Sequence, residues 1–260
     1  MRGPIGMDWQ QQGRALLVGG VAGFGGGLFS LGGGTLTIPL LMGWLGLDPF
    51  AARGTALAAA FFPAAFGAWL YHLHGRVDWP AVGLVALPSM LLTPLVGMWT
   101  ERFSGRRLRR LFGAVVIAGA FVLMLRGTLL GTWALEGEAR TFYLLAVGIV
   151  EGLVAGSVGV SGGPVLAPLL VIGLGMPQQL AQGCSLAARV PAVVTGSLEN
   201  FRCGHVRFRL LPGLVAGGMA GAWGGSLLAL DLREAHLRFL FALVLAGIGL
   251  RYLRGGEGPR

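Results

Sequence analysis

Long apolar stretches alternate along the chain with short polar segments that carry most of its charges. Residues 54–73, 80–99 and 210–230 each form a stretch of about 20 residues with few or no charged side chains, the length that an α-helix needs to cross a membrane. The pattern predicts three spanning helices in each half of the chain, over residues 54–73, 80–99 and 108–130 and over residues 183–201, 210–230 and 237–253. We expect no soluble domain between them.

Each half begins with an apolar segment that is too long for one simple span and is interrupted near its middle by glycines. These segments cover residues 15–45 and 142–174. Each arm of such a segment has about 14 residues and would rise roughly 21 Å as a helix, so it can pass the middle of the membrane and return. The pattern therefore predicts two re-entrant hairpins. Non-helical backbone at that depth is tolerated only where it is buried in protein or lines a cavity.

The two glycine-rich interruptions match each other. The first reads Gly32-Gly33-Gly34-Thr35, and the second reads Ser161-Gly162-Gly163-Pro164, 129 residues further on. At this offset, 20 of the 60 residues from 18 to 77 are identical to their partners from 147 to 206, which is too many for chance. We therefore expect a duplicated protein with two membrane repeats, residues 1–130 and 131–260. Paired interrupted helices at matching positions are typical of the binding sites of membrane transporters.

The distribution of arginines indicates how the two halves are oriented. If both hairpins re-enter, each half crosses the membrane three times, and the second half is inverted relative to the first. With the N-terminus in the cytoplasm, 14 arginines then face the inside and 5 the outside, while Arg189 lies within a helix. If the broken segments cross fully, the numbers are 11 and 8. Because positive residues collect on the cytoplasmic side, the first arrangement is favoured, with inverted repeats and both termini in the cytoplasm.

The composition agrees with an all-α integral membrane protein. Hydrophobic residues make up 54% of the chain and charged residues 12%, and the mean hydropathy is +0.72. The net charge is +9, but the arginines lie in short loops rather than along one basic face, so we expect no nucleic-acid partner. The sequence contains no metal-ligand cluster, nucleotide loop or flavin motif, so we expect no cofactor, no metal site and no enzymatic activity.

Arg189 is the most informative single residue, because it lies within a predicted apolar helix. An arginine within a span costs about 2.5 to 3.5 kcal/mol on insertion scales and usually faces the protein interior or a water-filled cavity. Its partner in the first half is Ala60, so the duplication does not explain it. Two hypotheses stay open: Arg189 binds an anion, or it forms a structural ion pair with Glu151 on the opposite hairpin arm. The two are compatible if an anion displaces the carboxylate.

The glycine interruptions supply a second means of binding anions. A helix that restarts after Gly34 or Gly163 presents unpaired N–H groups and the positive end of its dipole. We therefore expect a substrate site between the hairpin tips, formed by Arg189 with Gly33, Gly34, Thr35, Thr55, Ser161, Gly162, Gly163, Cys184 and Ser185. The candidates for gating or coupling are Arg53, Gln182 and Glu151, the first two being repeat partners.

A family resemblance rests on the segments that follow the two glycine breaks. The stretch Gly54-Thr55-Ala56-Leu57-Ala58-Ala59 and its counterpart Gly183-Cys184-Ser185-Leu186-Ala187-Ala188 each follow a break and a proline. With Gly33-Gly34, Pro39, Gly162-Gly163 and Pro168, they resemble the TauE/SafE family of sulfite and organosulfonate exporters, over about residues 16 to 253. The chain departs from the usual Thr-Ser pair at Ala56 and at Cys184-Ser185.

The resemblance implies a permease in the inner membrane of a bacterium. Its partners would be the lipid bilayer and a small anionic substrate, sulfite or a sulfonate, usually moved outward. The residues leave open which anion is carried, whether protons are coupled to it, and whether several copies of the chain assemble into a homo-oligomer.

Two other functions fit part of the pattern. The stretch Gly159-Val160-Ser161-Gly162 contains the glycine-x-serine-glycine sequence of rhomboid-type intramembrane proteases. Such a serine needs a base within hydrogen-bond reach, but all four histidines fall near predicted loops. A membrane scaffold or assembly factor would explain the packing glycines but would leave Arg189 and the paired breaks unexplained.

Overall fold

The computed structural model describes residues 9–99, 105–125, 135–158 and 163–254, and these residues form helices and connecting loops without a β-strand. The first half contains α1 (Trp9–Phe29), α2 (Gly32–Leu45), α3 (Pro49–Leu73), α4 (Trp79–Trp99) and α5 (Gly105–Leu125). The second half contains α6 (Gly137–Val158), α7 (Gly163–Leu174), α8 (Gln178–Arg202), the short 3₁₀ helix η2 (Phe208–Leu210), α9 (Leu211–Asp231) and α10 (Glu234–Leu253).

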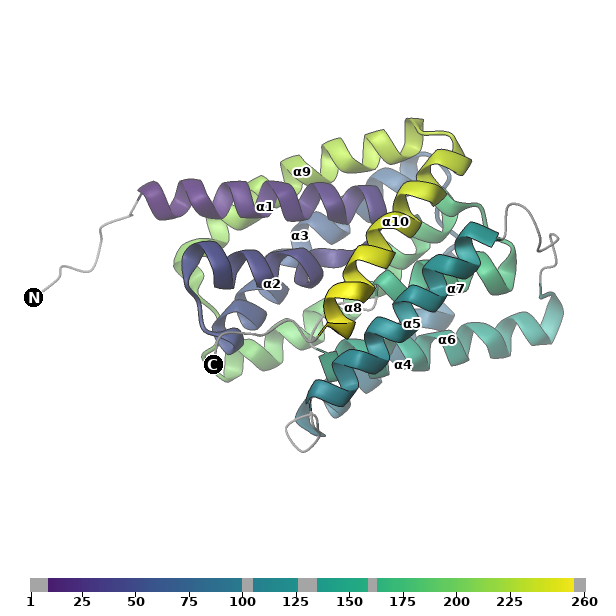
Figure 1. Cartoon of the computed structure of the whole chain (residues 1–260), viewed down its shortest axis with the longest axis horizontal. Helices are drawn as coiled ribbons and strands as arrows, with labels where there is room; N and C mark the ends of the chain where they lie inside the picture. Colours follow the sequence, from purple (N-terminus) through teal and green to yellow (C-terminus); the bar gives the residue numbers. More distant parts are fainter. Residues whose placement is uncertain (1–8, 100–104, 126–134, 159–162, 255–260) are drawn as a thin grey trace, which may run out of the picture.

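The two glycine-broken segments form helical hairpins with unequal arms. The first arms, α1 and α6, have 21 and 22 residues, whereas the returning arms, α2 and α7, have 14 and 12. The expectation of about 14 residues was therefore wrong for the first arms, because each helix begins in polar sequence before the apolar stretch, at Trp9 and at Gly137. The hairpins extend from opposite ends of the molecule toward its centre (Figure 1).

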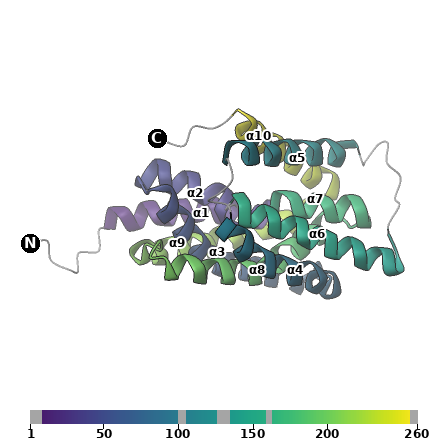
Figure 2. The same ribbon diagram turned by 90° about the horizontal axis from the view of Figure 1, so that it is seen from below.

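Helix packing follows the same scheme in both halves. Helix α1 packs along α9 as α6 packs along α4, and α3 contacts α9 as α8 contacts α4. The equivalent helices α3 and α8 also pack against each other, and so do α5 and α10, which lie together at one face of the molecule (Figure 2). Each hairpin is thus held by a helix from the other half, so neither half encloses its own hairpin.

Glycines allow the long helix pairs to approach closely. A β-carbon on Gly19 would stand 2.3 Å from the Leu214 carbonyl oxygen, and one on Gly148 would stand 2.4 Å from the Val85 carbonyl oxygen. These contacts are equivalent, since 19 and 148, like 85 and 214, differ by 129. The glycine spacing that predicts close packing in the sequence therefore serves the contacts α1–α9 and α6–α4.

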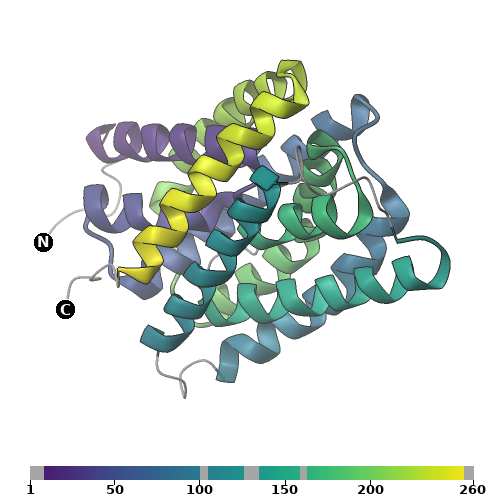
Figure 3. The ribbon, with the colours of Figure 1, turned by 45° about the vertical axis from the view of Figure 1, so that its right-hand side comes forward.

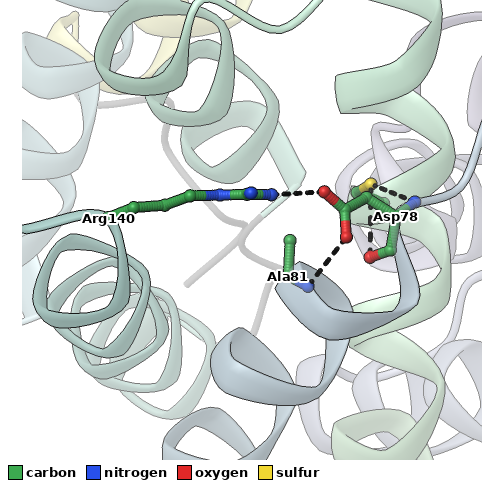
Figure 4. A network of polar contacts seen from close by, with 4 residues as sticks. Asp78, Ala81 and Arg140 are labelled. Carbon is green, nitrogen blue, oxygen red and sulfur yellow. Dashed lines mark hydrogen bonds and ion pairs between the residues drawn. The ribbon is translucent and has the colours of Figure 1, made fainter. Parts of the chain in front are cut away.

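The loops that follow α3 and α8 each donate a hydrogen bond to the other of these two central helices. The N–H of Arg207, after α8, donates to the Thr55 hydroxyl at 2.9 Å, and the N–H of Asp78, after α3, donates to the Cys184 sulfur at 3.2 Å. Asp78 also caps α4 through the N–H of Ala81 and pairs with Arg140 on α6 (Figure 4). These contacts join each α3–α4 or α8–α9 loop to the helix that crosses it.

The exposed surface is apolar and the interior is partly polar. Large side chains at Trp69, Leu87, Phe121, Phe142 and Trp223 are more than half exposed. Arg189, Glu151 and Gln182 are buried. This distribution reverses that of a soluble protein and fits a protein surrounded by lipid.

Five helical segments in the described part of the chain are long and apolar enough to cross a membrane, and they lie on α3, α4, α6, α9 and α10. Two of the six predicted spans are not among them. In α5, within the predicted span 108–130, only the 14 residues Phe112–Leu125 form an apolar helix in the described part of the chain. Helix α8, which covers the predicted span 183–201, contains glutamines and Arg189 that make it polar. It is buried along most of its length, so it needs no apolar surface toward lipid. The chain is a multi-pass α-helical membrane protein.

Candidate functional site

Arg189 lies where the two hairpins meet. Its Nη1 donates to the carbonyl oxygen of Ser30 at 2.6 Å. Ser30 separates α1 from α2 and adopts the left-handed conformation with φ 53°. Gly163 begins α7, and a β-carbon there would stand 2.1 Å from the Ser30 oxygen and 2.4 Å from Nη1 of Arg189. The guanidinium therefore contacts the tips of both hairpins, which come from opposite sides of the molecule (Figure 3).

Most of the donor capacity of Arg189 is unused. The side chain is 1% exposed, and its Nε and Nη2 atoms have no hydrogen-bond partner among the described residues. A buried charge without partners is costly, because the protein interior replaces water poorly. Two N–H-bearing atoms of a rigid, planar cation thus remain available to an acceptor, in the geometry that suits a carboxylate or another oxyanion.

A small cavity opens beside Arg189 between α3, α4, α6 and α8. Its volume is about 20 Å³, close to the room that one water molecule needs. The polar side chains that line it are Arg53, Thr93, Glu151, Arg189 and Glu199, and we refer to it as the charged cavity. Two arginines and two glutamates balance each other there when all four are ionised.

Glu151 shares the charged cavity with Arg189 but does not form a close ion pair with it. No nitrogen of Arg189 lies within 4.0 Å of a Glu151 oxygen. Oε2 of Glu151 accepts a hydrogen bond from the Ser89 hydroxyl, and Oε1 has no hydrogen-bond partner among the described residues. The carboxylate is 1% exposed. The hypothesis of a direct Arg189–Glu151 pair is wrong for this conformation, although the two charges face the same space.

The duplication produces a second cavity at the equivalent place, formed by residues of α1, α2, α3, α8 and α9. It has a volume of about 30 Å³ and is lined mostly by glycine and alanine, so we call it the glycine-alanine cavity. Seven residues of the charged cavity have their repeat partner, 129 positions away, in its lining. The pairs are Leu57 and Leu186, Thr93 and Ala222, Glu151 and Ala22, Ala155 and Gly26, Arg189 and Ala60, Ala192 and Pro63, and Val193 and Ala64. The ionisable side chains thus line one of these two equivalent cavities and are replaced by small or apolar residues in the other.

The predicted site residues divide into several groups. Arg189, Arg53 and Glu151 line the charged cavity, and Gly163 contacts Arg189. Gly33, Gly34 and Thr35 lie in the first turn of α2, where the Thr35 hydroxyl donates to the Leu31 carbonyl at 2.9 Å. Ser161 and Gly162 lie outside the described residues.

Thr55, Cys184, Ser185 and Gln182 line neither cavity. Thr55 and Cys184 accept the loop hydrogen bonds described above, and the hydroxyl of Ser185 is buried without a partner in the described part of the chain. Oε1 of Gln182 lies 3.0 Å from the hydroxyl of Tyr71, which is also 3.0 Å from the Gly27 carbonyl. Gln182 therefore ties α8 to α3 near the end of α1.

Two residues of the site were missed by the sequence analysis, Ser89 and Thr93 on α4. They are four residues apart and so lie on one face of the helix. Their repeat partners are Gly218 and Ala222. A hydroxyl pair at this spacing in an apolar span, present in only one repeat, was the signal that could have found them.

The described residues hold no group of three metal-ligating side chains, and none of the four histidines lines either cavity. The polar groups of the site are the buried pair Arg189 and Glu151, the partly buried pair Arg53 and Glu199, and the hydroxyls of Ser89 and Thr93.

Comparisons with known proteins agree over nearly the whole chain. The family described as Sulfite exporter TauE/SafE matches residues 3–134 and 144–260. A probable membrane transporter protein of Xylella fastidiosa is 30% identical over 241 residues, covering 89% of this chain and 91% of the relative. The probable membrane transporter protein YunE of Bacillus subtilis is 25% identical, covering 93% and 97%. A relative named in the same way from Methanocaldococcus jannaschii is 26% identical, covering 72% and 70%.

No solved structure matches the chain. The family match spans both halves, and the segments on which the resemblance rests, around Gly54 and Gly183, fall within it. The chain is a membrane transporter and belongs to the TauE/SafE family.

Proposed function

We propose that this transporter exports sulfite or organosulfonates across the cytoplasmic membrane and that Arg189 binds the anion. The observation that carries the proposal is the buried guanidinium at the junction of both hairpins, with Nε and Nη2 unpaired among the described residues. A compact oxyanion offers several acceptor oxygens to such donors. The family description names sulfite export, and the chemistry of the site agrees with it.

The first turn of α7 would add a second attraction for the anion. Gly163 is the first residue of this 12-residue helix and lies beside Arg189. The N-terminus of a helix carries unpaired N–H groups and the positive end of the helix dipole. The tip of α2, with Gly33, Gly34 and Thr35, would approach the same place from the opposite end of the molecule.

Export of an anion needs no other energy source when the cytoplasm is negative. Movement of one negative charge outward is downhill by about 2.3 kcal/mol for each 100 mV of membrane potential. We infer an inner-membrane location in a bacterium, with both termini in the cytoplasm and with residues 1–130 and 131–260 as inverted repeats. The helix pairings that recur between the halves support a repeated fold, and the hairpins that enter from opposite ends of the molecule support its inversion.

The anion would reach its site by alternating access. The charged cavity has room for about one water molecule, so a sulfur oxyanion fits only after the surrounding helices separate. In inverted-repeat transporters such opening is largely a rocking of one unit against the other. Arg53 and Gln182, at equivalent positions on α3 and α8, are the proposed gate residues, because each lies toward one end of the central helix pair.

The test is sulfite efflux from proteoliposomes at a fixed membrane potential. We expect Arg189→Ala to abolish the protein-dependent flux and Arg189→Lys to retain only part of it, since a lysine lacks the planar pair of donors. Arg251→Ala, an equal loss of charge on the exposed face of α10, is the control and should leave flux unchanged. Equal flux in Arg189→Ala would remove Arg189 from the substrate site. Absence of flux in the folded wild type would favour the scaffold hypothesis.

A further inference from the structure

The two equivalent cavities differ in one respect, which is the presence of ionisable and hydroxyl groups. Arg189, Glu151, Ser89 and Thr93 have Ala60, Ala22, Gly218 and Ala222 as their repeat partners. All four positions lie in or beside corresponding cavities, on α8, α6 and α4 at the charged cavity and on α3, α1 and α9 at the glycine-alanine cavity. Alanine and glycine are sufficient for helix packing at the four positions of the glycine-alanine cavity. Packing alone therefore does not explain why the equivalent positions of the charged cavity carry polar side chains.

Within this set, Glu151 forms no direct ion pair, although Arg189 attracts it across the charged cavity. It is buried, it is more than 4.0 Å from any nitrogen of Arg189, and Ser89 supplies its one hydrogen bond from the described residues. The other acid of the cavity, Glu199, is partly exposed, so water can solvate its charge. Of the two carboxyl groups in the charged cavity, Glu151 is the more deeply buried. Its ionised form is therefore the less well solvated, and protonation relieves a larger cost there than at Glu199.

The charged groups that face Glu151 come from two helices. Helix α8 contributes Arg189 and Glu199, and α3 contributes Arg53. Helices α4 and α7, which border the same region, contain no titratable side chain along their lengths. The cavity is neutral when all four groups are ionised, and an anion bound at Arg189 makes it negative.

We propose that Glu151 is a proton-binding site coupled to the anion, so that each anion is carried together with one proton. This inference rests on the proposed function, because it takes Arg189 as the anion site. An anion and the Glu151 carboxylate would repel each other in one small, desolvated space. A proton taken from the aqueous phase onto Oε1 removes this repulsion, leaves Oε2 bonded to Ser89, and gives Glu151 a donor hydrogen. The proton leaves when the anion does, on the other side.

The coupling has a definite charge balance. A monovalent sulfonate would move with one proton, and the cycle would carry no net charge. Divalent sulfite would move with one proton, and the cycle would carry one negative charge. Transport of a sulfonate would then be driven by the gradients of the anion and of pH and hardly by the membrane potential. The driving force of the potential described above for uniport would remain only for divalent sulfite.

The test uses proteoliposomes with an internal pH dye and two substrates, methanesulfonate and sulfite. Methanesulfonate keeps its charge throughout the pH range used, so its own titration cannot carry the proton. In the wild type, an outward anion gradient is expected to drive proton movement in the same direction, about one proton per anion. Glu151→Gln should still carry anion, at a changed rate, but without proton movement and with flux that now follows the membrane potential. Glu138→Gln, the same change at an exposed position of α6, is the matched control.

The outcomes separate the two proposals. Wild-type flux without proton movement, or proton movement that persists in Glu151→Gln, would overturn the coupling role and leave the anion site intact. Absence of wild-type flux with both substrates would overturn the proposed function itself. If only sulfite is carried, bisulfite can bring its own proton, and then the comparison with Glu151→Gln decides. If Glu151→Gln does not fold, Ser89→Ala replaces it: an unchanged pH dependence of flux in that variant would contradict the proposal.

Discussion

The carbonyl oxygen of Arg76 lies 2.0 Å from the position that a β-carbon on Gly183 would occupy, and the equivalent separation between His205 and Gly54 is 2.8 Å. Both glycines precede the residue that accepts a loop hydrogen bond, Cys184 or Thr55. The loop after each central helix therefore rests on the backbone of the other central helix. No side chain fits between them.

Gly183→Ala should consequently destabilise the protein. The loop at Arg76 must move away from α8, and overpacking of this kind costs about 1–3 kcal/mol. The loss should appear as a lower midpoint of thermal unfolding in detergent, and Gly54→Ala should show a smaller loss. Gly83→Ala is the control, because a β-carbon there meets no atom within 4 Å. A Gly183→Ala protein as stable as the control would show that the loop contact does not constrain the fold.

Gly163→Ala should impair transport more than stability. Its β-carbon would stand 2.1 Å from the Ser30 oxygen and 2.4 Å from Nη1 of Arg189, so the two hairpin tips would separate at the guanidinium. A strain of about 1–3 kcal/mol at the site corresponds to a roughly 5- to 150-fold loss in anion affinity. Affinity is measured from the concentration dependence of sulfite flux. Gly247→Ala, with nothing within 4 Å, should match the wild type, and so would Gly163→Ala if the tips did not form the site.

The two cysteines provide a test of the proposed topology. Cys203 is exposed in the loop after α8, whereas Cys184 is buried. With both termini in the cytoplasm, a membrane-impermeant maleimide should label inside-out vesicles at Cys203 and should leave right-side-out vesicles unlabelled. Cys203→Ala should remove the labelling of the inside-out vesicles. Labelling of right-side-out vesicles that depends on Cys203 would place this loop outside and reverse the topology.

Asp48, which caps α3, predicts a pH dependence of stability. The backbone N–H of Ala51 lowers the pKa of this carboxyl below its usual value of 3.8, with further help from Phe50 and Arg207. Because the folded-state pKa is depressed, the carboxylate stabilises the fold above the usual value, and this contribution is lost as the pH falls through the folded pKa. Thermal midpoints between neutral pH and about pH 3 should therefore fall more in the wild type than in Asp48→Asn. Parallel curves for the two proteins would exclude a titrating cap.

Much of the architecture could be predicted, because the physical signals are local. Apolar length marks the spans, and the glycine breaks mark the hairpins. Arg189 was identifiable as a functional candidate from the cost of its charge in an apolar helix. The lengths of α1 and α6 were not predictable from hydropathy, since a helix continues into polar sequence wherever its backbone bonds are satisfied.

The partners of the site residues could not be predicted, because they depend on which helices meet. The glycine spacing of α6 indicates that another helix approaches closely but not that it is α4, and so Ser89 was not connected with Glu151. Thr55 and Cys184 are short hydrogen-bonding residues beside the glycine breaks, which suggested a site. Their contacts with the opposite loops depend on the packing of the two halves, which no single repeat encodes.

The unequal cavities have a consequence for the resting behaviour of the carrier. If the two inverted halves were identical and exchanged conformations during transport, the inward-open and outward-open forms would be related by a two-fold rotation and would have equal energy. Here the ionisable groups line only one of the two equivalent cavities described above, so the two forms solvate them differently and differ in energy. The empty protein should then populate mostly one of the two forms, and release of the substrate should be faster on one side of the membrane than on the other. The duplication thus accounts for the two alternating forms, and the different linings of the two cavities decide which of these forms the empty carrier prefers.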